Sequence, residues 1–306
     1  MQRLAVLLVT GMSVACAATV LAQAPAQPSA PPASPAAGAA PAAPRYESRL
    51  EIVDIRSGER RVVHRAPVRF EAPNWSRDGK HLLINQQGAL YRVPVEGGTP
   101  VKVDLGTIEG CNNDHGYSPD GKWLAISCRP SSSVYVVPAA GGTPRLLTPR
   151  TPSYWHGWSP DGTTLAYVRV GVSDGSYDIW AQDLAGGAPR PLVTGPGVDD
   201  GPEYSPDGRH LYFNSTRSGA MALWRAGADG SEPVQLTRDP ARRDWFPHLS
   251  PDGRSIVYVS FGDDVALEDH PPNREDVQLR IMPADDIEPP AILTRLFGGQ
   301  GTINVP

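Results

Sequence analysis

The amino-acid sequence predicts an all-β protein, a six-bladed β-propeller of four-stranded antiparallel blades that is closed by pairing the N- and C-terminal strands. Three observations predict this fold. One short turn motif recurs five times, its copies are separated by 41 to 46 residues, and strand-like runs with glycine turns fill each interval. Four antiparallel strands in each repeat of about 40 to 45 residues are typical of a propeller blade.

The repeated motif is an aromatic residue or Leu followed by Ser-Pro-Asp-Gly, with Arg in place of Pro in the first copy. Its copies are Trp75–Gly79, Tyr117–Gly121, Trp158–Gly162, Tyr204–Gly208 and Leu249–Gly253. An Asp before Gly accepts hydrogen bonds from its own turn backbone, and Gly tolerates positive φ. We therefore interpret the five aspartates as turn formers and place the motif at the first turn of each blade.

Strand-like runs follow each copy of the motif. Leu165–Val168, Leu211–Phe213 and Ile256–Val259 have the β-branched and aromatic content of strands. A second run, such as Val134–Val137, comes before a glycine turn, such as Gly141-Gly142, whose residues tolerate the positive φ of hairpin turns. A final short strand ends the repeat, which gives four strands in each blade.

The two ends of the chain are expected to supply the sixth blade. Arg49–Val53 and Arg61–His64 flank a turn at Ser57-Gly58 and predict the third and fourth strands of a blade that lacks its first two. Gly298–Pro306 is interpreted as the approach to another first strand. Pairing of the termini would then close the ring and remove an exposed sheet edge.

These repeats resemble those of TolB-like propellers. The resemblance rests on Ser-Pro-Asp-Gly at the first turn, Gly-Gly at the third turn and Leu-Thr at the end of the blade, and it covers residues 46–306. It implies a propeller fold, a periplasmic location and a face that docks a protein partner or an envelope component. The residues before position 46 predict no counterpart of the α/β domain that precedes the propeller in TolB. Similar repeats also form propeller domains of peptidases and of oligogalacturonate lyase, so the motif is specific for fold and not for function.

Residues 1–22 have the features of a secretory signal peptide. Arg3 lies in a short basic region, Leu4–Val20 is apolar, and Ala22 ends a small-residue cleavage site. We therefore expect a periplasmic or secreted protein.

A tether is expected between the signal peptide and the propeller. Residues 23–45 consist almost entirely of Ala, Pro, Gln, Ser and Gly, a composition that predicts disorder. A lipoprotein anchor at Cys16 is disfavoured because Ser13 stands where a lipobox normally has Leu. The predicted organisation is thus a signal peptide at 1–22, a tether at 23–45 and a propeller at 46–306.

The overall charge limits the classes of partner. A net charge of −5 at pH 7 gives no indication of binding to nucleic acid or to an anionic membrane. After the signal peptide, no apolar run is long enough to span a bilayer. We expect a monomer with no nucleic-acid partner and no transmembrane segment.

Polar residues are expected to gather at one mouth of the central channel, where each innermost strand begins. TolB-like repeats usually carry Pro three residues before the Ser of the turn, but His115 and His156 stand there in two adjacent blades. Together with His248 and His270, they are candidate ligands for one divalent metal ion, because converging imidazoles and carboxylates can bind such ions.

Other residues at the same mouth are candidates for catalysis or ligand binding. Asp114 and Asp200 are candidate bases. The candidate ligand-binding residues are Asn113, Trp155, Asp199, Trp245 and Asn273. Polar residues in a propeller channel are also ordinary lining that bonds water and neighbouring loops. The sequence leaves both interpretations open.

Cys111 and Cys128 are placed symmetrically about the turn between them, so they are expected to be cross-strand neighbours. A disulfide between them in an oxidising compartment would stabilise the fold by about 3 kcal/mol. The alternative is a pair of buried thiols.

The sequence supports two hypotheses for function. The first is a non-enzymatic binding or scaffold protein for an envelope partner or a polar ligand at the channel mouth. The second is a metal-dependent lyase or hydrolase that acts there on a polar or anionic carbohydrate, by analogy with oligogalacturonate lyase. The two histidines that replace Pro favour the second hypothesis, whereas the resemblance to TolB favours the first. No nucleophile elbow, zinc-binding helix, phosphate-binding loop or dinucleotide fingerprint occurs.

Overall fold

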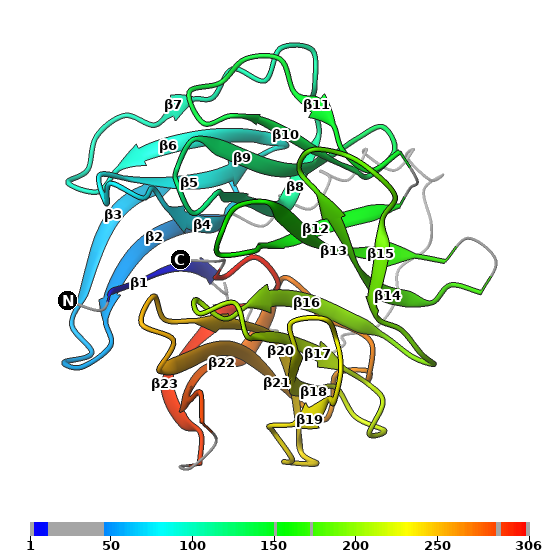
Figure 1. Cartoon of the computed structure of the whole chain (residues 1–306). Helices are drawn as coiled ribbons and strands as arrows, with labels where there is room; N and C mark the ends of the chain where they lie inside the picture. Colours follow the sequence, from blue (N-terminus) through cyan, green and yellow to red (C-terminus); the bar gives the residue numbers. More distant parts are fainter. Residues whose placement is uncertain (1–2, 12–45, 150–151, 172–173, 286–288, 304–306) are drawn as a thin grey trace, which may run out of the picture.

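The computed structural model describes residues 3–11, 46–149, 152–171, 174–285 and 289–303. These residues form 23 β-strands that surround a central axis (Figure 1). Across these ranges, no helix is long and apolar enough to cross a membrane.

Five blades are four-stranded antiparallel sheets, each with its strands in sequence order from the axis outward. The first contains β4 (Phe70–Trp75), β5 (His81–Gln86), β6 (Ala89–Pro94) and β7 (Val101–Lys102). The second contains β8 (Cys111–Tyr117), β9 (Trp123–Cys128), β10 (Ser133–Pro138) and β11 (Arg145–Leu146). The third contains β12 (Ser153–Trp158), β13 (Thr164–Val170), β14 (Tyr177–Asp183) and β15 (Arg190–Val193). The fourth contains β16 (Asp199–Tyr204), β17 (His210–Ser215), β18 (Ala222–Gly227) and β19 (Val234–Gln235). The fifth contains β20 (Arg242–Leu249), β21 (Ser255–Gly262), β22 (Arg274–Pro283) and β23 (Ala291–Gly298).

The remaining sheet has three strands, β1 (Arg3–Gly11), β2 (Tyr46–Asp54) and β3 (Arg60–Ala66), in that order. The propeller of four-stranded antiparallel blades is therefore confirmed, whereas the count of six such blades is not. Within the described residues β2 pairs with β1 and β3, and no strand from the C-terminal end joins this sheet. The predicted closure by an N- and C-terminal strand pair is thus not observed.

The C-terminal segment lies instead against the first blade, where the Ala72 amide donates to the Gly301 carbonyl at 2.7 Å. Residues 304–306 lie outside the described residues. The predicted tether at 23–45 and residues 12–22 of the predicted signal peptide also lie outside them, so both segments stay predictions.

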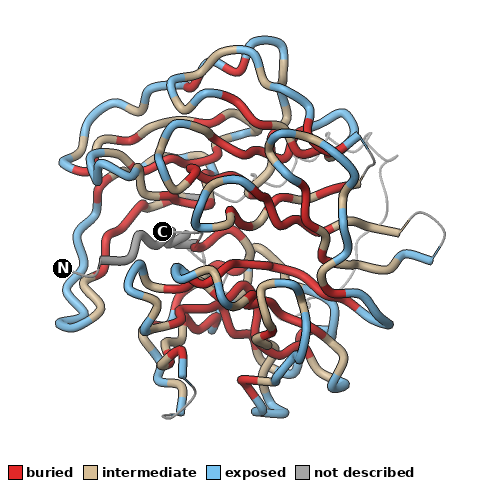
Figure 2. The backbone as a smooth tube through the Cα atoms, viewed as in Figure 1, coloured by how far each residue is buried: buried red, intermediate tan, exposed pale blue. Residues whose placement is uncertain are grey.

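The hydrophobic core lies between neighbouring blades and is densest along the second strands (Figure 2). All four residues of Leu165–Val168 in β13 are buried. A strand that is covered on both faces favours such a continuous apolar run over an alternating one. The fourth strands lie at the rim and expose side chains such as Val101 and Leu146.

The repeated motif forms the same turn in every blade. In the second blade, the Ser118 hydroxyl donates to the Asp120 carboxylate at 2.6 Å and the Lys122 amide donates to the same oxygen at 3.0 Å. These hydrogen bonds, with that of Ser118 the largest cause, lower the pKa of Asp120 to about 2. Gly121 adopts a φ of 70° at the end of the turn. The motif turns follow the ends of the first strands and lie on one face of the propeller. The beginnings of the first strands therefore lie on the opposite face.

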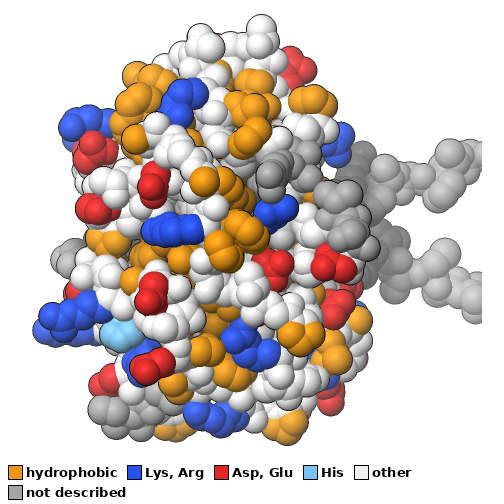
Figure 3. All heavy atoms as spheres, turned by 45° about the vertical axis from the view of Figure 1, so that its right-hand side comes forward, with side chains coloured by type: hydrophobic (Ala, Val, Ile, Leu, Met, Phe, Trp, Pro, Cys, Tyr) orange, Lys and Arg blue, Asp and Glu red, His pale blue; other side chains and the backbone are white. Residues whose placement is uncertain are grey.

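Charged side chains of both signs lie on the face seen in Figure 3. Figure 3 shows basic, acidic and hydrophobic side chains interspersed over the face in view. This mixture agrees with the small net charge of the chain.

Candidate functional site

The innermost strand of each four-stranded blade is interrupted by a β-bulge close to the channel mouth. The shifts in register lie at Glu71–Asn74 in β4, Cys111–His115 in β8, Trp155–Gly157 in β12, Asp200–Glu203 in β16 and Trp245–His248 in β20. The position three residues before the Ser of the motif, Pro in three blades and His in two, falls inside each of these segments. A bulge bends its strand and redirects side chains, and bulges often occur beside functional sites. The repeat thus builds a ring of redirected side chains around the opening.

Two of these bulges hold non-glycine residues in the left-handed region. Ala72 has a φ of 57° and Phe246 a φ of 56°. The Phe246 amide donates to the side-chain oxygen of Asn214 at 3.0 Å, which fixes the backbone in this conformation. Such conformations persist where the surrounding structure over-determines them, and they cluster at functional sites.

His156 and Asp200 form an ion pair between the third and fourth blades. His156 Nε2 lies 3.0 Å from Asp200 Oδ1, and the same oxygen accepts the Gly201 amide at 2.6 Å. Burial alone would lower the pKa of His156, but the carboxylates of Asp200 and Asp114 raise it above its ordinary value. Burial alone would raise the pKa of Asp200, but His156 lowers it below its ordinary value. Both shifts favour the charged pair.

Asp114 completes this cluster from the second blade. It is buried, and burial raises its pKa to about 6 in spite of the opposing effect of His156. The side-chain amide of Asn112 donates to its carboxylate, and the Asp114 amide donates to the Asn112 side-chain oxygen at 3.0 Å. The structure therefore brings together Asp114, His156 and Asp200, which we call the acidic cluster, from three consecutive blades.

An aromatic group lies beside the acidic cluster. Phe246 stacks on His156 with ring centroids 6.1 Å apart, and His270 lies edge-on to Trp245 at 4.5 Å and to Phe246 at 5.4 Å. His270 also interacts electrostatically with Asp200. The enlarged turn of the fifth blade thus carries His270 to the mouth. The sequence analysis did not select Phe246. The only feature that marks this residue is its position in the bulge of β20.

The two tryptophans among the predicted ligand-binding residues, Trp155 and Trp245, belong to the core. Trp155 is 1% exposed and Trp245 is 0% exposed. A Cβ on Gly116 would lie 2.3 Å from the Trp155 ring, so this glycine makes room for the indole. Both indole rings are packed in the core, whereas Phe246 and His270 are more exposed than either of them.

The four predicted metal ligands do not converge. His115 is fully buried, and burial lowers its pKa to about 4. His248 Nδ1 lies 2.9 Å from Glu203 Oε2, whose other oxygen accepts the Leu249 amide, so this pair is separate from that of His156. Among the described residues, no group of three or more His, Cys, Asp or Glu side chains is arranged to hold a metal ion. The geometry of these residues therefore gives the predicted divalent metal site no support.

The remaining predicted residues are not part of the acidic cluster. Asp199 accepts a hydrogen bond from Arg217 at 2.8 Å, although burial raises its pKa. Asn113 is half-buried within the bulged segment of β8.

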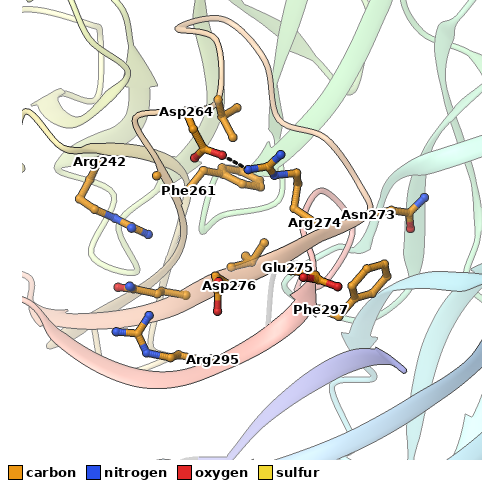
Figure 4. A pocket seen from close by; sticks show the side chains of 13 residues that line it. Arg242, Phe261, Asp264, Asn273, Arg274, Glu275, Asp276, Arg295 and Phe297 are labelled. Atoms are coloured by element: carbon orange, nitrogen blue, oxygen red, sulfur yellow. Dashed lines mark hydrogen bonds and ion pairs between the residues drawn. The ribbon is translucent and has the colours of Figure 1, made fainter. Parts of the chain in front are cut away.

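Asn273 is exposed and lines a pocket of about 720 Å³ in the fifth blade (Figure 4). Arg274 and Asp264 form an ion pair in this pocket, and none of the acidic-cluster residues lines it. Asn273 therefore lines a cavity to which Asp200 does not contribute.

Cys111 and Cys128 are joined by a disulfide and are cross-strand partners in β8 and β9. The side-chain amide of Asn85 donates to the carbonyls of Cys111 and Asn112 at 2.7 and 2.8 Å. These contacts anchor the segment that carries Asp114.

Comparisons with known proteins agree with the fold. A family model described as the TolB β-propeller domain matches residues 156–279. An uncharacterized protein of Agrobacterium fabrum is 50% identical over 264 residues, which cover 85% of this chain and 87% of the relative. A solved structure from Agrobacterium tumefaciens that carries a provisional TolB name has a TM-score of 0.80 and 48% identity, and the match covers 86% of this chain and 93% of that one.

TolB from Acinetobacter baumannii has a TM-score of 0.69 at 18% identity, with 85% of this chain and 63% of that one covered, a likeness of fold alone. The family of this chain is assigned from two findings together, the 48% identity to the solved structure over most of both chains and the match to the family model. The chain belongs to the TolB-like β-propeller family.

Proposed function

We propose that this chain is an exported propeller that acts as a non-enzymatic binding or scaffold protein. Its channel-mouth face would engage an envelope protein or a polar ligand. The observation that carries the proposal is the acidic cluster, in which His156 pairs with the buried carboxylate of Asp200 and interacts electrostatically with that of Asp114.

The charge balance of this cluster favours a ligand that brings hydrogen-bond donors or a positive charge. Asp200 is already engaged by His156 and by the Gly201 amide. Asp114 is buried and accepts a hydrogen bond from the Asn112 side-chain amide, and burial of a carboxylate is costly unless it is paired and hydrogen-bonded. A hydrogen-bond donor or cation of a partner would therefore bind more favourably at Asp114 than at Asp200.

The surroundings of the cluster suit binding. Phe246 supplies an apolar ring, His270 adds an imidazole edge-on to it, and the bulged strands hold the polar groups on rigid elements. Binding sites commonly combine such apolar surface with a few fixed polar groups. Export to the periplasm or beyond follows from the predicted signal peptide and agrees with the pairing of the two cysteines.

Site-specific photo-crosslinking tests this proposal. A photoreactive residue at Glu268, which interacts electrostatically with Tyr177 beside Asp200, would sample the mouth, and one at Lys80 would sample the motif-turn face. We expect adducts with an envelope component from position 268 and none from position 80. Asp114→Asn should abolish the adducts without altering the circular dichroism spectrum. Equal labelling from both positions would contradict the proposal.

A second candidate function is a lyase or hydrolase that acts on a polar or anionic carbohydrate. The observation in its favour is the pKa of Asp114, which at about 6 suits a general acid or base near neutral pH. The test is turnover of polygalacturonate and neutral oligosaccharides, with and without added manganese. Activity that disappears in Asp114→Asn would favour this candidate, and no turnover under any of these conditions would exclude it for these substrates.

A further inference from the structure

The strand β1 would be absent from the exported protein. It pairs antiparallel with β2 over nine residues, from Arg3 opposite Asp54 to Gly11 opposite Tyr46 (Figure 1). The same nine residues lie inside the predicted signal peptide. Removal of that peptide would therefore take away the whole ladder on one edge of β2.

Exposure of that edge of β2 to water would be unfavourable, because the strand is largely buried. Ser48, Leu50, Ile52 and Val53 are all buried in the structure. Backbone N–H and C=O groups at an unpaired edge are a template for another strand, and burying them without partners is costly. The processed chain would thus present an open strand position inside an otherwise paired propeller.

The walls beside this position determine which strand fits it. Leu50 and Ile52 belong to the hydrophobic cluster that contains Phe70 and Leu82 of the first blade. Val53 belongs instead to the cluster of the fifth blade, with Leu279 and Leu296. A strand that enters here meets apolar surface on both faces, so a continuous apolar run suits it better than an alternating one.

One polar feature of β2 adds specificity. Glu51 is buried, and its Oε2 atom has no hydrogen-bond partner among the described residues. The nearest cation, Arg60, lies 3.9 Å away, beyond hydrogen-bonding distance. Glu51 stands opposite Val6, so a donor side chain at the position of Val6 in an incoming strand would lie on the same face as this carboxylate.

We propose that β2 of the processed protein is a strand-accepting site for a partner protein. The occupant is an extended segment of about nine residues that runs antiparallel to β2, is apolar on both faces and carries a hydrogen-bond donor opposite Glu51. This is recognition by strand addition, in which main-chain hydrogen bonds give affinity and side chains give specificity. The proposal rests on the proposed export but not on binding at the channel mouth.

A partner is favoured over segments of the same chain. The run that fits, Leu4–Val9, would be absent from every processed copy, so a second copy could not supply it. The described C-terminal residues lie against β4, where Gly301 accepts the Ala72 amide. Neither of these segments is therefore placed to fill the position.

Cutting the full chain after it has folded tests the proposal. A protease recognition sequence placed within residues 23–45 would separate β1 from β2 without altering any strand. A fluorescent peptide with the sequence of residues 3–11 should then replace the cut fragment at a ratio of one to one. The matched control peptide carries Leu7→Pro, which removes an amide donor and should lower binding by at least about tenfold.

Two further peptides test the chemistry of the position. Val6→Ser places a donor opposite Glu51, and we expect it to bind about threefold more tightly than the parent peptide. Leu4→Ser places the same hydroxyl opposite Val53, and it should bind about tenfold more weakly. The reverse order of affinities would overturn the assignment of Glu51.

Hydrogen exchange of the amides in Tyr46–Asp54 completes the test. The amides that point toward β1 should exchange slowly with the peptide bound and rapidly after the fragment has been washed away, whereas those that point toward β3 should stay protected. If cutting unfolds the chain, recovery of the fold on addition of the peptide supports the proposal and failure to recover overturns it. Slow exchange without peptide would also overturn it, because the chain or a second copy would then fill the edge. Crosslinking at the channel mouth is measured separately, so the two proposals can fail independently.

Discussion

His156 Nε2 and Asp200 Oδ1 lie 3.0 Å apart and join the innermost strands of two adjacent blades. The raised pKa of His156 stabilises the fold below the unfolded value of about 6.5, and this contribution is lost as the pH rises through the folded value. The lowered pKa of Asp200 stabilises the fold above its unfolded value, and this contribution is lost as the pH falls through the folded value. The pair should therefore contribute most between about pH 4 and pH 6.5.

Asp200→Asn should lower the free energy of unfolding by about 3 kcal/mol at about pH 5, because it leaves a buried imidazolium without its partner. The loss should be smaller at about pH 9, because the contribution of His156 falls as the pH rises through its folded pKa. Urea unfolding at the two pH values measures the difference. The exposed Lys122–Asp120 pair is the control, and Lys122→Ala should change stability by less than about 1 kcal/mol. Equal losses for Asp200→Asn at both pH values would contradict the assigned ion pair.

Asp114 should destabilise the fold at neutral pH. Its folded pKa of about 6 lies above the unfolded value, so stability falls as the pH rises between the two values and stays lower above pH 6. Since one pKa unit corresponds to about 1.4 kcal/mol, the penalty reaches about 3 kcal/mol. Asp114→Asn should remove most of it and raise the urea midpoint at about pH 8 but not at about pH 4. A variant that is more stable yet no longer crosslinks at the mouth would show that the carboxylate serves binding.

The fold was largely predictable because its signals are local. Asp120 and Ser118 form their turn from residues that are adjacent in sequence, so the motif alone predicts where each blade begins. The closure of the ring depends on which distant segments meet, and no local pattern determines that. The predicted partner of β2 was a C-terminal strand, whereas the structure pairs it with β1.

The site was predictable in part for the same reason. His156 could be predicted because it departs from the usual repeat, and Asp200 because it lies where the innermost strand of its blade begins; the structure brings the two together. Phe246 was not visible, because its role comes from a bulge whose geometry depends on contacts with the neighbouring blade, such as that of Asn214. The burial of Trp155 likewise depends on the space that Gly116 leaves beside it.

Loss of the disulfide should destabilise the fold while leaving the propeller intact. The bond closes a short loop, with a sequence separation of 17 residues. Cys111→Ser combined with Cys128→Ser should lower the free energy of unfolding by about 3 kcal/mol. Urea unfolding of this variant should match that of the parent chain under reducing conditions. If the reduced parent chain were as stable as the oxidised one, the bond would have no role in stability.

The bulge at Phe246 allows backbone strain to be separated from the contacts of the ring. Phe246→Ala and Phe246→Gly both remove the contacts with His156 and His270, but only glycine accepts a φ of 56° without steric conflict. The glycine variant should therefore be about 1 kcal/mol more stable than the alanine variant in urea unfolding. Ala72→Gly is the matched control, since Ala72 has a φ of 57° and this variant removes no aromatic ring, and it should raise stability by a similar amount. Equal stability of the two Phe246 variants would mean that the strand relaxes once the ring is gone, and the ring itself would then hold the bulge in place.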